Sequence, residues 1–186
     1  MQHAVSFNSH SLRRLRACGL AIGAAALIAA SAKVQIPFWP VPMTLHTLAV
    51  LGFSAAMGPR LGLAAMATYL CAGLAGLPVF SGSPERGIGL AYAVRPTGGY
   101  LLGFLVASWL TGRLAGKGGA LRIAGAMMAG LAVVYALGLA WLVMFVPARS
   151  LVSVGLAPFL PGDLLKIGLG VAMICGWRSL RSGAAR

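Results

Sequence analysis

The sequence predicts an all-α integral membrane protein with six transmembrane helices. Of its 186 residues, 59% are hydrophobic and 9% are charged, whereas an average soluble domain carries about 25% charged residues. The apolar residues fall into runs separated by clusters of proline, glycine and arginine. Because a helix of about 20 residues crosses a bilayer, the length suffices for about six such helices and leaves no room for a soluble domain. We therefore expect one membrane domain, residues 1–186.

The first predicted helix, residues 17–34, follows a basic cluster formed by Arg13, Arg14 and Arg16. A cleavable secretory signal has the same order of charged region, apolar run and small-residue ending. Since the chain continues at once into further apolar runs, we expect a retained helix instead. Small residues recur at every fourth position of this helix, which permits close packing against a helix of the same chain or of another subunit in an oligomer. These residues are Ala17, Ala21, Ala25 and Ala29.

Five further apolar runs give the remaining helices. The second and sixth are short for a hydrocarbon layer of about 30 Å at 1.5 Å per residue, which indicates tilt, burial or extension into the neighbouring loops. In chain order, the predicted helices after the first are residues 43–58, 61–79, 98–114, 121–146 and 161–177.

The basic residues predict the orientation of these helices. Cytoplasmic loops of membrane proteins are enriched in lysine and arginine. With both termini inside, ten basic residues lie on the cytoplasmic side and four on the external side, and Lys166 lies at membrane depth. The sequence therefore predicts an N-in, C-in topology. The external four are Lys33, Arg86, Arg95 and Arg149, and the cytoplasmic ten are Arg13, Arg14, Arg16, Arg60, Arg113, Lys117, Arg122, Arg178, Arg181 and Arg186.

One of the two acidic residues of the chain, Asp163, lies in the last apolar run, three positions before Lys166. Residues three apart on a helix are neighbours, and each charge costs roughly 2.5–3.5 kcal/mol to insert. A plain ion pair that hides two charges from lipid is one interpretation. A ligand site is the other, in which the carboxylate accepts N–H groups and the ammonium attracts a carboxylate. Pro161-Gly162 places Asp163 in the first helical turn, where the helix dipole also favours an anion.

The two long external loops carry further candidates. Pro37, Pro40 and Pro42 exclude an ordinary span before the second helix. Phe38 and Trp39, between these prolines, belong either to the aromatic belt of the membrane interface or to a lid over a cavity. Across the second loop, the candidates are Ser81, Ser83, Arg95 and Tyr100. Arg95 offers a planar fork to a carboxylate, although an arginine that only snorkels to the interface is the alternative.

Several classes of function are excluded by the sequence. The fifteen basic residues are scattered between apolar runs and form no continuous basic face, so we expect no nucleic-acid partner. The chain has no GxxxxGK[ST], HExxH or GxSxG motif, so we expect neither an enzyme nor a cofactor. We expect His46 to be a buried histidine hydrogen-bonded in the core rather than a metal ligand, and we expect no metal site.

Four segments occur in an order that resembles one family across nearly the whole chain: IPFWPVPMTLHTLAVL, YLCAGLAGLPVFSGS, RPTGGYLLGF and PFLPGDLLK. They resemble the BioY family, the biotin-specific substrate-binding (S) components of energy-coupling factor (ECF) transporters. The resemblance implies a six-helix S-component fold in the bacterial cytoplasmic (inner) membrane and capture of biotin from outside. It also implies coupling to a transmembrane T component and two ATP-binding-cassette (ABC) ATPases, with uptake by toppling of the S component. The alternatives are an S component for another small carboxylate-bearing vitamin and a membrane scaffold that transports nothing.

By position, the resemblance assigns Asp163 to the ureido ring of biotin, and Lys166 and Arg95 to its carboxylate. Ser81 or Ser83 stands closest to the ureido-binding amide of the family, and His46 stands where the family has glutamine. The alanine stripe of the first helix resembles the surface of the family that meets the T component, which implies that role for Ala21, Ala25 and Ala29.

Overall fold

The computed structural model describes residues 2–36 and 43–183, and within them the protein is almost entirely helical. The elements are α1 (Gln2–Lys33), β1 (Gln35–Ile36), β2 (Met43–Thr44), α2 (His46–Met57), α3 (Pro59–Leu74), α4 (Gly89–Ala93), α5 (Gly98–Ala115), α6 (Ala120–Leu142), the 3₁₀ helix η1 (Ala148–Ser150), α7 (Leu151–Gly155) and α8 (Leu160–Gly183). An all-α protein is the prediction from the sequence, and it is confirmed.

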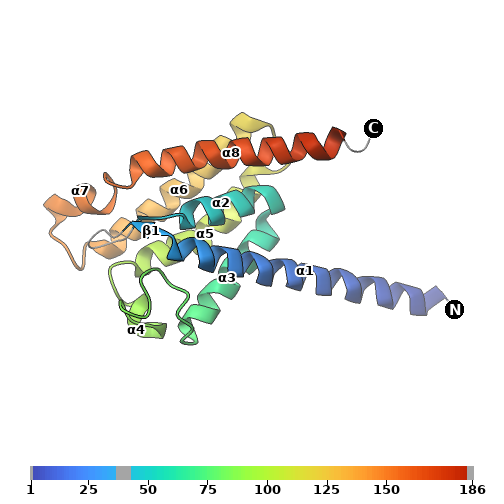
Figure 1. The fold of residues 1–186 in the computed structure, drawn as a ribbon, viewed down its shortest axis with the longest axis horizontal. Coiled ribbons are helices and arrows are strands. Elements are labelled where there is room, and N and C mark those ends of the chain that lie inside the picture. Colours follow the sequence, from blue (N-terminus) through green and yellow to red (C-terminus); the bar gives the residue numbers. More distant parts are fainter. Residues whose placement is uncertain (1, 37–42, 184–186) are drawn as a thin grey trace.

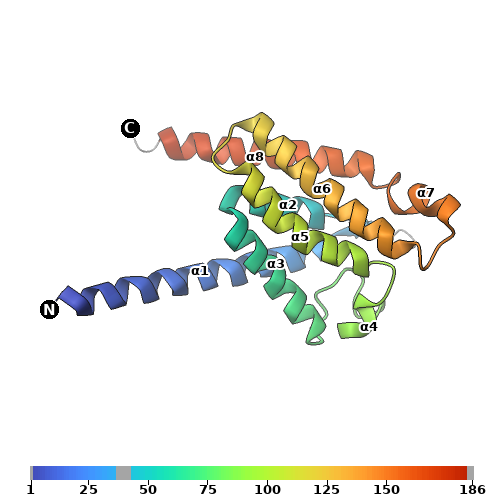
Figure 2. The same cartoon turned by 180° about the vertical axis from the view of Figure 1, so that it is seen from behind.

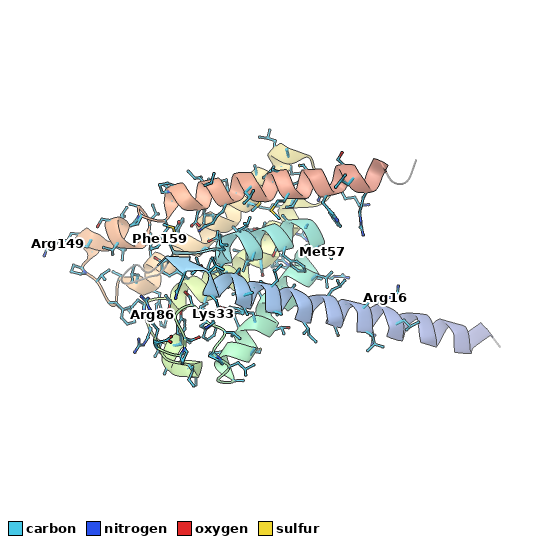
Figure 3. All side chains as sticks on the ribbon, viewed as in Figure 1. Arg16, Lys33, Met57, Arg86, Arg149 and Phe159 are labelled. Carbon is cyan, nitrogen blue, oxygen red and sulfur yellow. The ribbon has the colours of Figure 1, made fainter. Side chains whose placement is uncertain are left out.

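The helices form a bundle whose two ends differ (Figures 1 and 2). The long helices α1 and α8 flank the bundle, and both chain termini project from the same end. The short helices α4 and α7 and the β1–β2 pair lie at the opposite end, which we call the loop end. Figure 3 shows Arg16 on the projecting part of α1, whereas Lys33, Arg86 and Arg149 lie toward the loop end.

The helix limits correct the sequence prediction in several places. α1 begins far before residue 17, and α8 continues past residue 177 to Gly183. α3 ends at Leu74 rather than at residue 79, and Gly76 follows it with φ +100°, a conformation that ends helices. α6 ends at Leu142 rather than at residue 146, because the chain continues in turns, in which the N–H groups of Met144 and Phe145 bond to the carbonyl oxygens three residues before them.

Three segments of the described chain are long and apolar enough to cross a membrane: Arg14–Lys33, Ala120–Leu142 and Ala148–Arg181. α2 is also apolar but has only 12 residues. β1, which follows α1, and β2, which precedes α2, form a short antiparallel pair in which Gln35 lies opposite Thr44. Residues 37–42, between the two strands, are not among the described residues, and the predicted site residues Phe38 and Trp39 belong to this segment.

Glycines allow α5 to pack closely against its neighbours. A Cβ atom on Gly103 would lie 2.8 Å from Cα of Val134 in α6, and one on Gly99 would lie 2.2 Å from Cβ of Trp141. Real Cβ atoms do not approach other atoms so closely, hence only glycine fits there. Close helix packing therefore accounts for these glycines, which from the sequence alone could also have served a ligand. The contact sets α6, and with it Tyr135, beside α5.

Candidate functional site

Asp163 and Lys166 form the ion pair that their spacing predicts. Lys166 Nζ donates a hydrogen bond to Asp163 Oδ1 at 2.8 Å. Asp163 is only 5% exposed, because it lies in the first turns of α8 and faces α6 across the bundle. Two residues that the sequence analysis did not select complete the group. Tyr135 Oη donates to Asp163 Oδ2 at 2.6 Å, and Lys166 Nζ also donates to the carbonyl oxygen of Thr44 at 2.7 Å.

The pair retains hydrogen-bonding capacity for a ligand. An ammonium has three N–H donors and an ionised carboxylate has about four acceptor positions. Among the described residues, the two hydrogen bonds of Lys166 leave one N–H uncommitted, and those of Asp163 leave about two acceptor positions. A ligand that offers an oxygen to Lys166 and an N–H to Asp163 can therefore bind without separating the pair.

The pair faces a small cavity, which we call the charged cavity. Its volume is 60 Å³, and it is lined by residues of β2, α2, α5, α6 and α8 and of the loop before α8. A second cavity of 60 Å³, which we call the aromatic cavity, lies beside it. Thr44, Tyr100 and Phe104 line both. Sites for small molecules usually have about 300–1,000 Å³, so a vitamin-sized ligand requires the two cavities to widen or to merge.

Aromatic side chains from three helices build the aromatic cavity. Its lining includes Tyr69 of α3, Tyr92 of α4 and Phe104 of α5. Tyr92 stacks on Phe80 at 4.7 Å between ring centroids, and its Oη donates to the carbonyl oxygen of Ser81 at 2.8 Å. Burial raises the pKa of Tyr92 above its ordinary value, so the phenol stays protonated at neutral pH. Among the described residues, this lining contains no lysine, arginine, aspartate or glutamate.

The structure brings some of the predicted loop residues to these cavities. Tyr100 lines both, and its Oη donates to the carbonyl oxygen of Gly155 at 2.8 Å. Ser81 lines the aromatic cavity, and its Oγ donates to Gln35 Oε1 at 2.6 Å. Arg95 is exposed and lines neither of these cavities, while its carbonyl oxygen accepts from Trp141 Nε1 at 3.0 Å.

Ser83 is held by a lysine that the sequence analysis placed in the first external loop without giving it a role. Lys33 Nζ donates to the carbonyl oxygens of Phe80 and Ser83, at 3.1 and 2.7 Å, and to Ser83 Oγ at 3.1 Å. Ser83 Oγ in turn donates to the carbonyl oxygen of Phe80 at 2.7 Å. Ser83 is buried in this contact and does not line either cavity. Lys33 thus ties the end of α1 to the second loop.

His46 is buried, as expected, at 4% exposure. The expectation that its ring is hydrogen-bonded in the core is wrong. Neither ring nitrogen has a hydrogen-bond partner among the described residues, although the carbonyl group of Ile28 lies close to the ring. The imidazole lines the aromatic cavity instead.

The alanine stripe of α1 packs within the chain. Ala21 and Ala25 are each 7% exposed and Ala29 is half-buried, because this face of α1 lies on α3 and α2. An internal partner, one of the two alternatives, is therefore present. Beside the stripe, an open apolar groove of 590 Å³ runs between α1, α2 and α8.

Comparison with known proteins identifies the family. The family model described as the BioY family matches residues 2–182. "Biotin transporter BioY" of Thermotoga maritima is 40% identical over 144 residues, which cover 76% of this chain and 83% of that protein. "Probable biotin transporter BioY" of Pyrococcus horikoshii is 34% identical over 146 residues, which cover 78% and 86%.

A solved structure shows the same fold. The S-component for biotin from an ECF-type ABC transporter aligns with a TM-score of 0.78 at 24% sequence identity, covering 90% of this chain and 93% of that one. At this identity the structural match supports the fold alone. The match of the family model over nearly the whole chain and the two relatives settle the classification: the chain belongs to the BioY family.

Proposed function

We propose that this chain captures biotin at the membrane as the S component of an ECF-type ABC transporter and serves biotin uptake. The observation that carries the proposal is the buried group of Asp163, Lys166 and Tyr135 beside a cavity lined by aromatic rings. Biotin combines a carboxylate with a flat, neutral bicyclic ring. The membership of the chain in the BioY family supports the same ligand.

The charges favour one orientation of the ligand. Among the described residues, Lys166 is the only lysine or arginine that lines either of the two cavities, and a buried carboxylate needs a cation. We therefore assign the biotin carboxylate to the uncommitted N–H of Lys166. Asp163 Oδ1 and Lys166 Nζ are 2.8 Å apart, much closer than the two polar ends of an extended biotin. Asp163 therefore lies at the same end of the ligand and holds Lys166 in place, while its own open acceptor positions stay unused by the ligand, because a carboxylate has no N–H to donate.

The remaining candidates take positions around this core of the site. Tyr100 and Ser81 contribute to the cavity walls, and Ser83 supports the second loop through Lys33. We propose Arg95 as a residue of the entrance that attracts the anionic ligand, and Phe38 with Trp39 as the lid. An Arg95→Ala variant should then slow the association of biotin, with a smaller effect on affinity than a substitution of Lys166.

We propose six membrane spans with both termini in the cytoplasm of a bacterial cell, in its cytoplasmic membrane. α1, α2, α3, α5, α6 and α8 are the six helices. The loop end, with both cavities, would then face outward, in agreement with the sequence assignment of Arg149 to the outside and Arg16 to the inside. The lipid bilayer would surround the apolar outer faces of these helices.

We propose that a T component and ABC ATPases complete the transporter, because the sequence has no ATP-binding motif of its own. The T component would contact α1 along Ala21, Ala25 and Ala29. Since Ala21 and Ala25 are buried within the chain and α1 packs on α3 and α2, this contact requires α1 to shift, whereas Ala29 is only half-buried. An oligomer of the S component would compete for the same surface.

Titration of the purified full-length chain with biotin tests the proposal. We expect saturable binding of biotin and no competition from thiamine or riboflavin. In the double variant Asp163→Asn/Lys166→Ala, we expect biotin affinity to fall by about 30-fold or more, because breaking a buried charged contact costs about 2–5 kcal/mol. Competition by another carboxylate-bearing vitamin would indicate a different ligand. If no ligand at 1,000 times its expected dissociation constant adds the roughly 4 kcal/mol of stability that tight binding gives, the chain is a scaffold.

A further inference from the structure

His46 has hydrogen-bonding capacity that the folded chain leaves unused. It is the first residue of α2 and is 96% buried, since its exposed fraction is 4%. Neither Nδ1 nor Nε2 has a hydrogen-bond partner of good geometry among the described residues, although the carbonyl group of Ile28 lies close to the ring. Buried polar atoms in native proteins are nearly always hydrogen-bonded, and an exception calls for an explanation such as an absent ligand. The ring lines the aromatic cavity, so a molecule in that cavity can reach it.

The position of the imidazole is fixed by its neighbours. Its ring lies edge-on to Phe104 at 4.6 Å between centroids and tilted against Tyr69 at 5.1 Å. The backbone N–H of His46 donates to Thr44 Oγ1 at 3.2 Å, and Thr44 lines both cavities. A side chain held in this way presents a donor and an acceptor at a defined place, without the entropy cost of ordering it on binding.

The tyrosine hydroxyls of this cavity already donate within the protein. Tyr92 donates to the carbonyl oxygen of Ser81, Tyr100 to that of Gly155 and Tyr69 to that of Val79 at 3.4 Å. These hydroxyls hold the wall together, and their protons are not available to a ligand. The neutral imidazole, in contrast, offers one N–H donor and one nitrogen acceptor.

The lining also restricts the charge of what binds there. The described residues that line the aromatic cavity include no lysine, arginine, aspartate or glutamate, and an unpaired charge is costly in such surroundings. The group beside His46 is therefore neutral, with an acceptor or a donor at its edge. A cyclic urea has both, next to each other and in the plane of a ring that fits between aromatic side chains.

We propose that His46 hydrogen-bonds directly to the ureido ring of biotin and is a specificity-determining residue for that ring. This inference rests on the proposed function and completes it: the ring occupies the widened aromatic cavity, and the carboxylate reaches Lys166 through the boundary formed by Thr44, Tyr100 and Phe104. It assigns to His46 part of the ureido recognition that the family resemblance implies for Asp163.

Two variants of the purified full-length chain test the role of His46. His46→Leu removes both nitrogens, and we expect biotin affinity to fall about tenfold while the stability of the unliganded chain changes little, since only the approach of the ring to the Ile28 carbonyl is lost. His46→Gln keeps a donor and an acceptor, and we expect affinity within about threefold of the wild type. Wild-type affinity in His46→Leu would overturn the inference. Failure of the wild type to bind biotin would instead overturn the proposed function.

A spectroscopic measurement decides the question even if His46→Leu does not fold. The chain has three histidines, and His46→Gln identifies the imidazole signals of His46 in a ¹⁵N-histidine NMR spectrum. We expect the ¹⁵N shifts of that ring to change on addition of biotin, as a new hydrogen bond requires. Unchanged shifts at saturating biotin would refute a direct contact.

Discussion

Replacing Tyr135 by phenylalanine removes a single hydroxyl group from the site and leaves the ring in place. In the structure this hydroxyl donates to Asp163 Oδ2 at 2.6 Å, in surroundings where Asp163 is 5% exposed. A hydrogen bond to a charged group contributes about 1.5–3 kcal/mol. The adjacent charged cavity of 60 Å³ has room for a water molecule that would replace part of the bond. We therefore expect Tyr135→Phe to lower the free energy of unfolding by about 2 kcal/mol.

Tyr100→Phe is the matched control. It deletes the same atom from another buried tyrosine, whose hydroxyl donates at 2.8 Å to the neutral carbonyl oxygen of Gly155. A bond between neutral groups contributes about 0.5–1.5 kcal/mol, roughly half as much as a charge-assisted one. Both variants are compared without ligand by reversible unfolding in mixed micelles of detergent and SDS. Equal losses in the two variants, or no loss in Tyr135→Phe, would refute the claim that the Tyr135 hydroxyl stabilises the ion-paired Asp163.

Two further predictions concern packing and the second loop. Gly112→Ala should reduce the yield of folded protein, because the new Cβ would lie 2.6 Å from backbone atoms of the turn between α2 and α3. Gly125→Ala is the control and should be tolerated, because its Cβ meets no atom within 4 Å. Gel filtration of both variants, which reports monodispersity, measures the difference. Lys33→Met should speed trypsin cleavage after Arg86, because it releases the loop that Lys33 holds, while Lys117→Met should leave the rate unchanged. Normal folding of Gly112→Ala, or equal cleavage rates in the two lysine variants, would contradict the packing described.

The sequence predicts the local part of the site and misses the distant part, for a physical reason. Asp163 and Lys166 are three residues apart on one helix, so their spacing alone predicts the pair. Their other partners come from Tyr135, 28 residues before Asp163, and from Thr44, 122 residues before Lys166. Only the packing of α6 and of the β2 segment against α8 brings these residues together. A tyrosine inside an apolar run is a weak signal, since a buried hydroxyl needs a partner, but it does not name the partner.

The helix limits and the packing faces of the helices are likewise predicted only in part from the sequence. Apolar runs locate the main helices, yet Leu74 and Leu142 end their helices before the apolar character ends. Turn geometry around Gly76 and after Leu142 decides these ends, and hydrophobicity does not report it. The stripe that contains Ala21 indicates a close contact without saying which helix makes it, because any helix fits a small-residue surface. The sequence likewise indicates an ordinary core residue at His46, because the residues that form the cavity around it, such as Tyr69 and Phe104, come from other helices.

The central claim is that Lys166 binds the carboxylate of biotin at one end of a site formed by the two cavities. The most direct test measures the affinities of wild type and Lys166→Met for biotin and for biotin amide, which lacks the negative charge. Comparing the two ligands cancels any general damage that the substitution does to the fold. We predict that Lys166→Met weakens biotin binding by about 30-fold or more and amide binding by less than about threefold. Equal losses for both ligands, or no loss for biotin, would contradict the account.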